Sequence, residues 1–329
     1  MRRYLHSGDI AFRFKQTKED FFVEELPLRE FAQKGKYVIA KVKKTEMTTW
    51  DAVATLSKYL NLQSGDIGYA GLKDKHATTI QYFSFDARYI SALKKFRHKN
   101  LEILDLVKDT KSIRMGDLSA NRFVINLYEM DNIKTGQVEK IAKKILKEGL
   151  ANYFGYQRFG RDKDALDQAR EMLAGERFIK DTKVRNFLIS VYQSHLFNEW
   201  LKKRIELSSD GKFKLLRGDV YMDEREKLFT PKEPPLADFL QKKVLPTGLL
   251  CGRGAFRARF EAREIEKEFD DEYLPYKGYR RAAIVFPKEF GVTLHAKKEM
   301  ATLRFVLPKG AYATSFVEAL RGQEIEPVS

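Results

Sequence analysis

The chain has 329 residues, 43% of them hydrophobic, which predicts two domains, or one domain with a large insertion, and excludes long disordered segments. Lys and Arg number 61 against 46 Asp and Glu, and this net charge of +15 is spread along the chain, which favours a nucleic-acid partner over a membrane surface. No apolar run approaches the ~18 residues of a membrane-spanning helix, no signal-peptide pattern opens the sequence, and the single cysteine, Cys251, excludes an internal disulfide, so we expect a cytoplasmic protein.

Strand and helix patterns alternate over the first 148 residues. Residues 37–43 and 78–85 are rich in β-branched and aromatic side chains, which predicts two strands, and "IGYAG" fits a third, short one. Thr48 and Asp51 have the spacing of a capping box, which predicts the start of a helix. The apolar residues of that helix recur at helical intervals at Trp50, Val53, Leu56 and Leu60.

Two further elements follow in this first part of the chain. Residues 121–128 alternate as a strand, with Asn121, Phe123, Ile125 and Leu127 on one face. Residues 137–150 show the clearest helical period, and Gly149 is a natural helix stop.

The character of the sequence changes after Gly149. Residues 152–173 and 184–207 predict helices separated by loops, and Val184, Phe187, Leu188, Val191 and His195 form one stripe of the second helix. Four of the nine prolines fall in 230–248, which predicts a loop with a short helix, and 256–274 predicts a charged amphipathic helix. Strand-like runs return at 282–286 and 301–308, and a closing helix follows at 312–320. This order predicts a discontinuous α+β domain interrupted by a helical insertion.

The segment "GYAGLKDKHATT" (68–79) places Asp74 between Lys73 and Lys75, on a connection between two predicted strands. The flanking lysines favour the ionised carboxylate, which suits a nucleophile, a general base or an electrostatic stabiliser. An ordinary solvated turn is the alternative. No second carboxylate, Ser-His pair or Cys-His pair accompanies Asp74 locally.

Three other stretches carry side chains suited to RNA. Asn121 and Phe123 point the same way on their strand, so the amide fits a base edge and the ring fits base stacking, whereas a strand-end Asn beside a core Phe is the alternative. The aromatic and Arg residues of "NYFGYQRFG" (152–160) suit stacking on unpaired bases and binding of phosphate. Tight packing where a helix meets a loop is an equal alternative. Tyr312 precedes a predicted helix, and the N-terminus of a helix is suited to binding phosphate. The alternative is that Tyr312 is an ordinary core residue.

No metal or nucleotide cofactor is expected. The five histidines do not have metal-ligand spacing, and HExxH and CxxC motifs are absent from the sequence. GxGxxG and GxxxxGK[ST] motifs are absent as well. A phosphodiesterase, which needs a metal site, is therefore disfavoured.

Six stretches, in this order, resemble the TruD family of tRNA pseudouridine synthases: "AGLKDKHATT", "SANRF", "NYFGYQRFG", "SHLFNEWL", "LPTGLLCGRG" and "FVLPKGAYATSFVEAL". The resemblance runs from about Phe21 to Leu320. It implies an isomerase that converts a uridine of tRNA, expected at position 13, to pseudouridine without a cofactor or a metal.

The resemblance also assigns expected roles to single residues. The catalytic aspartate falls on Asp74 and its neighbouring lysine on Lys73. The substrate-binding positions fall on Phe21, Asn121, Phe123 and Tyr312. Tyr312 stands where the family commonly has Phe, which keeps a stacking face and adds a hydroxyl, and Ala120 replaces the usual Gly before Asn121.

The fold implied by the resemblance is a pseudouridine synthase core, a mixed and mainly antiparallel sheet flanked by helices, with a large inserted helix-rich domain. We expect residues 1–148 and 286–329 to form the discontinuous catalytic domain and residues 149–285 to form the insertion. We also expect a monomer, because no heptad pattern or large apolar stripe stands out.

Isomerisation of uridine requires the base to leave its stack, because stacked bases hide the glycosidic bond. Phe21, Phe123 and Tyr312 are then expected to bracket the flipped base, and Asn121 to hydrogen-bond its edge. Lys73 and Lys75 would offset the repulsion between Asp74 and RNA phosphates. Whether Asp74 attacks the sugar, adds to the base or abstracts a sugar proton stays open, and a non-catalytic RNA-binding or RNA-folding protein on the same scaffold is the alternative.

Overall fold

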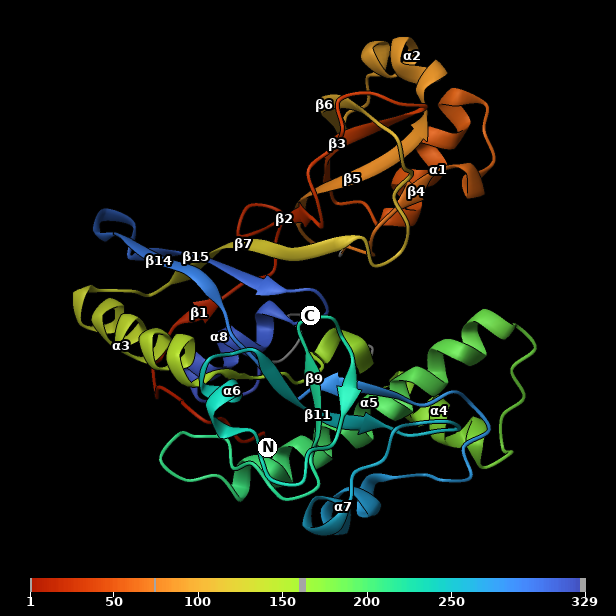
Figure 1. Ribbon diagram of the computed structural model, residues 1–329. Coiled ribbons are helices and arrows are strands. Elements are labelled where there is room, and N and C mark those ends of the chain that lie inside the picture. The colour runs from red at the N-terminus through yellow and green to blue at the C-terminus, as the bar shows by residue number, and fades with distance from the viewer. Residues whose placement is uncertain (1, 74, 160–163, 326–329) are drawn as a thin grey trace. The chain divides into compact units, whose positions relative to one another are not determined.

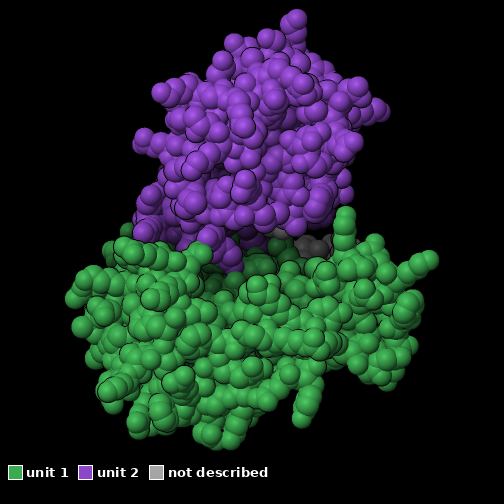
Figure 2. Space-filling model, turned by 45° about the vertical axis from the view of Figure 1, so that its right-hand side comes forward, with its two compact units in different colours: residues 1–10, 137–287, 311–329 green, residues 11–136, 288–310 purple. Residues whose placement is uncertain are grey.

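The computed structural model describes residues 2–73, 75–159 and 164–325 (Figure 1). The chain divides into two compact units, coloured separately in Figure 2. Unit 1 comprises Met1–Ile10, Gln137–Pro287 and Ala311–Ser329, and unit 2 comprises Ala11–Gly136 and Lys288–Gly310. These are units of packing. The expected functional division, 1–148 with 286–329 around 149–285, stays a prediction.

Unit 2 is built on a nine-stranded sheet with the order β14-β15-β7-β2-β5-β3-β6, to which β1 adds at β7 and β4 adds at β5. All of its pairs are antiparallel except β2–β5, which is parallel. The strands are β1 (Arg13–Phe14), β2 (Phe21–Pro27), β3 (Tyr37–Thr45), β4 (Gly68–Tyr69), β5 (Thr78–Asp86), β6 (Leu101–Asp109), β7 (Leu118–Tyr128), β14 (Lys288–His295) and β15 (Met300–Pro308).

Helices cover the β3–β5 part of this sheet (Figure 1). The capping box at Thr48 is present, since its side chain accepts a hydrogen bond from Asp51 N and the Asp51 carboxylate accepts one from Thr48 N. Apolar residues of the helix that follows pack against Val42 and Phe83. Trp50 is 58% exposed, so its expected place in the apolar stripe of this helix is wrong. The helices of unit 2 are α1 (Thr49–Leu60), α2 (Ile90–Lys95) and the short turns η1 (Ser64–Asp66), η2 (Ala87–Tyr89) and η6 (Ala296–Lys298).

The helix α3 (Asn132–Glu148) starts in unit 2 and continues into unit 1. It buries Val138, Ala142 and Ile145, as its period predicts. The expected stop at Gly149 is confirmed, because this residue takes φ +101°, a conformation that favours glycine.

Unit 1 combines helices with two small sheets. A four-stranded antiparallel sheet has the order β10-β9-β11-β12, and β13 pairs with β8. The elements are β8 (Leu150–Ala151), η3 (Tyr156–Phe159), α4 (Asp164–Leu173), α5 (Thr182–Glu206), β9 (Val220–Asp223), β10 (Leu228–Phe229), α6 (Leu236–Leu240), β11 (Val244–Leu250), α7 (Phe260–Glu266), η5 (Lys267–Phe269), β12 (Tyr279–Ala282), β13 (Ile284–Val285) and α8 (Ala313–Arg321).

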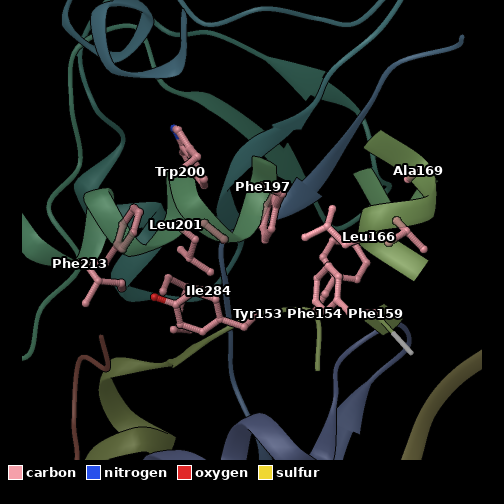
Figure 3. Packing of buried hydrophobic residues seen from close by; sticks show 14 of the residues in the cluster. Tyr153, Phe154, Phe159, Leu166, Ala169, Phe197, Trp200, Leu201, Phe213 and Ile284 are labelled. Atoms are coloured by element: carbon pink, nitrogen blue, oxygen red, sulfur yellow. The ribbon is translucent and has the colours of Figure 1, made fainter. Parts of the chain in front are cut away.

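The core of unit 1 forms around α5 (Figure 3). Phe197, Trp200 and Leu201 of this helix pack with Tyr153 and Phe154 of the preceding loop. In the described part of the chain, no helix is both long enough and apolar enough to cross a membrane.

Several expected elements of the second half differ from the structure. Residues 152–155 are not helical, and the helix expected over 256–274 is confined to α7 and the turn η5. Val184 and Phe187 of the expected α5 stripe are 43% and 44% exposed. The four-stranded sheet was not expected, because its strands are short and carry no sustained alternation.

Candidate active site

One face of the unit 2 sheet carries three of the six predicted site residues, Phe21, Asn121 and Phe123. Along β2, alternation places Phe21, Val23 and Glu25 on the buried face. Along β7 it does the same for Asn121 and Phe123, and the register of the two strands sets Glu25 opposite Asn121. The buried faces of β2 and β7 therefore meet in one surface.

The rings of Phe21 and Phe123 lie side by side on this face. Their centroids are 6.0 Å apart in an edge-to-face arrangement, and Phe305 of β15 stacks on Phe123 at 5.5 Å. Phe21 is 3% exposed and Phe123 is 6% exposed. In this structure both rings are thus part of the packed sheet surface, and only a small edge of each remains open.

Asn121 is buried at 8% exposure, and its side-chain oxygen has no hydrogen-bond partner among the described residues. Thr79 of β5 likewise has a buried hydroxyl without a partner in this part of the chain. A buried acceptor without a donor is unfavourable by about 1–3 kcal/mol. These atoms are suited to a polar ligand that supplies the missing hydrogen bonds.

The loop between β4 and β5 carries Lys73, which is held at three atoms. Its backbone N donates to Thr49 Oγ1 at 2.9 Å, and its backbone O accepts from Lys44 Nζ at 3.4 Å. Its own Nζ forms an ion pair with Glu25 Oε2 at 2.9 Å, with side-chain exposures of 8% and 1%. The loop is therefore anchored as far as Lys73, the last described residue before position 74.

Two more buried side chains support the same loop. Gln81 of β5 donates from Nε2 to the backbone O of Gly71 and accepts at Oε1 from Thr49 Oγ1 at 3.1 Å. Lys44 of β3 is fully buried and also donates from Nζ to Met47 O. Glu25, Lys44, Thr49 and Gln81, from four different elements, therefore form a polar clamp around Gly71–Lys73.

The start of α1 is itself fixed next to this clamp. The side chain and backbone of Thr48 hydrogen-bond the Asp51 carboxylate, which lowers the pKa of Asp51 below its ordinary value. The cap therefore stays ionised, and Thr49 is held where it bridges Gln81 and Lys73.

Asp74 lies outside the described residues. The residues that follow it, Lys75 and His76, are exposed, and Ala77 N donates to Lys75 O at 2.9 Å. The position of Asp74 in the chain is thus between an anchored Lys73 and an exposed Lys75.

Tyr312 belongs to unit 1, whereas Phe21, Lys73, Asn121 and Phe123 belong to unit 2. Tyr312 is the N-cap residue of α8, and its ring lies 6.0 Å from that of Phe154. A Cβ on Gly155 would come within 2.8 Å of the Tyr312 ring and 2.7 Å of Thr314 Oγ1. Glycine is required in "NYFG" because the ring approaches the backbone so closely.

Sequence reasoning missed the clamp residues Glu25, Lys44, Thr49 and Gln81. A signal exists for two of them, because Glu25 is in phase with Phe21 and Val23, and Gln81 is in phase with Phe83. A polar residue in the buried phase of a strand is informative, since burial of such a group requires partners. Among the described residues, no three His, Cys, Asp or Glu side chains gather in a way that could hold a metal ion.

The chain is similar to proteins of one description. The family model for tRNA pseudouridine synthase D (TruD) matches residues 1–177 and 179–320. A protein named tRNA pseudouridine synthase D from Nitratiruptor sp. is 38% identical, covering 98% of each chain, and another of that name from Sulfurimonas denitrificans is also 38% identical with 98% coverage of each.

A solved structure from Methanosarcina mazei, described as a putative tRNA pseudouridine synthase D, matches with a TM-score of 0.70 at 23% identity, covering 98% of this chain and 97% of that one. This likeness concerns the fold, and it confirms the expected α+β class with a large, mostly antiparallel sheet and flanking helices.

Proposed function

The chain belongs to the TruD family of tRNA pseudouridine synthases, and on this premise we propose that it isomerises a uridine of tRNA, expected at position 13, to pseudouridine. The proposed catalytic group is the carboxylate of Asp74. The proposed substrate-binding residues are Phe21, Lys73, Asn121, Phe123 and Tyr312.

The observation that carries this proposal is the anchoring of Lys73 at its backbone N, its backbone O and its Nζ. A catalytic group must be held close to its productive position, and a loop secured by buried hydrogen bonds provides this. An ordinary solvated turn does not need four buried polar side chains to support it. The clamp therefore favours a functional loop over the turn alternative.

The reaction exchanges one glycosidic bond for another. The C1′–N1 bond of uridine breaks, the uracil rotates, the C1′–C5 bond forms, and the proton of C5 is lost while N1 gains one, so the product is an isomer. The base must first leave its stack. Asp74 acts either at the sugar, as nucleophile or as base, or by addition to the uracil, and each of these roles needs its ionised form.

The ion pair of Lys73 changes how the lysines around Asp74 are understood. The charge of Lys73 is already matched by Glu25, so Lys73 serves substrate binding by holding the loop in place, and not by supplying an unpaired charge. Lys75 is exposed, and it is the lysine that offsets the repulsion between Asp74 and the phosphates. Asn121 accepts a hydrogen bond from the N–H of the flipped uracil, because its side-chain oxygen lacks a donor.

The decisive experiment compares Asp74→Asn with the wild-type protein on an unmodified tRNA transcript. Pseudouridine formation should fall by roughly 10²–10⁴-fold, as expected for loss of a catalytic carboxylate, and tRNA binding should persist. Asp105→Asn removes an exposed carboxylate of the same unit and should retain full activity. Mapping the modified base tests position 13.

Two outcomes would contradict the proposal. Full activity of Asp74→Asn would remove this carboxylate from the mechanism. Wild-type protein that binds the transcript but forms no pseudouridine would instead favour the non-catalytic RNA-binding protein.

A further inference from the structure

Arg281 of β12 lies against three aromatic rings of unit 1. Its guanidinium carbon lies 4.0 Å from the ring centroid of Phe154, 5.6 Å from that of Phe197 and 5.9 Å from that of Tyr312. Its Nε donates to Asn152 O at 3.1 Å and its Nη2 donates to Asn152 Oδ1 at 2.7 Å. The guanidinium is therefore fixed in both position and orientation.

A second guanidinium shares the same ring. Arg158 of η3 has its guanidinium carbon 5.7 Å from the centroid of Phe154 and 5.7 Å from that of Phe187. Its Nε donates to Ser194 Oγ at 3.2 Å. Two cations thus lie on one aromatic side chain, where their mutual repulsion is unfavourable.

No carboxylate among the described residues forms an ion pair with Arg158 or Arg281. Burial lowers the pKa of Arg281 to about 10, Tyr312 opposes this shift, and the charge of Arg158 reinforces it. Two other arginines of unit 1 with buried side chains do form ion pairs, Arg280 with Glu266 and Arg204 with Asp219. The two guanidiniums around Phe154 therefore form a half-buried positive site for which the described residues supply no anion.

We propose that Arg158 and Arg281 bind one backbone phosphate of the RNA, beside the nucleotide that stacks on Tyr312. This inference rests on the proposed function, because it takes RNA to be the ligand. Planar guanidinium groups match phosphate oxygens in bidentate geometry. The two guanidiniums on one ring supply four or more N–H donors, and no carboxylate of residues 2–73, 75–159 or 164–325 forms an ion pair with them.

Two neighbouring features fit a nucleotide better than a free anion. Phe187 is 44% exposed, so the ring that contacts Arg158 has an open surface on which a base can stack. The helix α8 starts at Ala313, and its N-cap residue Tyr312 makes no side-chain capping hydrogen bond. The positive end of this helix adds to the field of the two arginines.

The test measures the affinity for an unmodified tRNA transcript over a series of KCl concentrations. Arg158→Gln and Arg281→Gln should each weaken binding and reduce the slope of log K against log[KCl] by roughly 0.7–0.9, the contribution of one phosphate. Arg158→Lys keeps the charge and should keep most of the slope. Arg225→Gln removes an exposed charge of the same unit and should match the wild-type slope.

The slope separates a phosphate contact from a packing role, because a variant that only loosens the fold loses affinity or melting temperature without a change in slope. Wild-type slopes for both glutamine variants, or an equal loss in Arg225→Gln, would overturn the inference. If Arg281→Gln does not fold, Arg158→Gln decides the question, since the Arg158 side chain makes a single hydrogen bond within the described part of the chain, to Ser194 Oγ.

Assaying the same samples for pseudouridine distinguishes a failure of the phosphate site from a failure of the proposed function. If the wild-type protein forms pseudouridine but the variants show unchanged slopes, only the proposed phosphate site is contradicted. If the variants show reduced slopes but the wild-type protein forms no pseudouridine, the phosphate site is supported and the proposed enzymatic activity is contradicted. Wild-type protein that does not bind the transcript would overturn both.

Discussion

The side-chain oxygen of Asn121 is suited to binding a ligand and does not stabilise the fold. It is buried, and the described residues offer it no donor. Natural proteins retain such unsatisfied groups mainly where function needs them, because they reduce stability. The same strand position opposite Glu25 places the amide beside the clamp that holds Lys73.

We predict that Asn121→Leu separates activity from stability. Leucine has a similar volume and no acceptor, so the free energy of unfolding should stay the same or rise by up to ~1 kcal/mol. Loss of one hydrogen bond to the base should lower kcat/KM for pseudouridine formation by about tenfold or more. Urea unfolding and a single-turnover assay measure the two quantities. A strongly destabilised but fully active Asn121→Leu would show that the amide serves the fold.

Single residues of the site could be predicted from the sequence only in part. The alternation of 121–128 correctly placed Asn121 and Phe123 on one buried face, because a strand has a period of two. The pairing of Lys73 with Glu25 could not be predicted, since it joins the loop before β5 to β2, and the contact depends on the parallel pairing of β2 with β5. The role of Asp74 is not tested, and it stays a prediction.

At the level of elements, α5 is tied to the loop before β9 by a buried ion pair. Arg204 donates from Nη1 to Asp219 Oδ1 at 2.6 Å and from Nη2 to Asp219 Oδ2 at 3.0 Å, with exposures of 1% and 3%. Arg204 also donates to Lys214 O and lies over the rings of Trp200 and Phe213. The pair thus fixes the direction in which the chain leaves the helix.

Arg204→Met should destabilise unit 1 by about 3–5 kcal/mol, because it leaves the Asp219 carboxylate buried without a cation. Lys203→Met is the matched control. Its ion pair with Glu268 is about half exposed, so solvent screens it and little change is expected. Urea unfolding followed by circular dichroism measures both, and Arg204→Met with Asp219→Leu should recover most of the loss. Equal effects of Arg204→Met and Lys203→Met would contradict this account.

Elements with strong local signals could be predicted, and those fixed by tertiary contacts could not. The capping box at Thr48 and the glycine stop at Gly149 are confirmed, because both depend on neighbouring residues only. Residues 152–155 were expected to open a helix. In the structure, Asn198 takes Phe154 N and Phe154 O as hydrogen-bond partners, and this tertiary contact replaces the helical bonds. The strands β9 and β10 are too short for a pattern of alternation to be visible.

On the scale of the whole molecule, the two units carry carboxylates with opposite responses to acid. In unit 2, burial works to raise the pKa of Asp109, but hydrogen bonds from Arg29, Thr110 N and Ala32 N outweigh it and leave the pKa below its ordinary value. In unit 1, burial raises the pKa of Glu318 above its ordinary value despite its contact with Arg2.

The opposite directions of the pKa shifts of Asp109 and Glu318 predict that acid destabilises unit 2 more than unit 1. A carboxylate with a depressed pKa stabilises the fold above its unfolded pKa, and this contribution is lost as the pH falls below about 4. A carboxylate with a raised pKa does the reverse, so the contribution of Glu318 improves as the pH falls through its folded pKa. Hydrogen exchange read by mass spectrometry at pH 5 and pH 3, corrected for intrinsic rates, resolves the units separately. Peptides from β3 and β6 should lose protection more steeply than peptides from β9 and β11, by roughly tenfold for each pH unit that separates the folded and unfolded pKa values of Asp109.

Asp109→Asn tests whether this residue is responsible, because asparagine accepts similar hydrogen bonds but does not titrate. The variant should be less stable than the wild type at pH 5, since it loses the charge that faces Arg29, and it should lose less protection between pH 5 and pH 3. If unit 1 opens first in acid, or if Asp109→Asn shows the wild-type pH dependence, then the ion pair with Arg29 does not set the acid limit of unit 2.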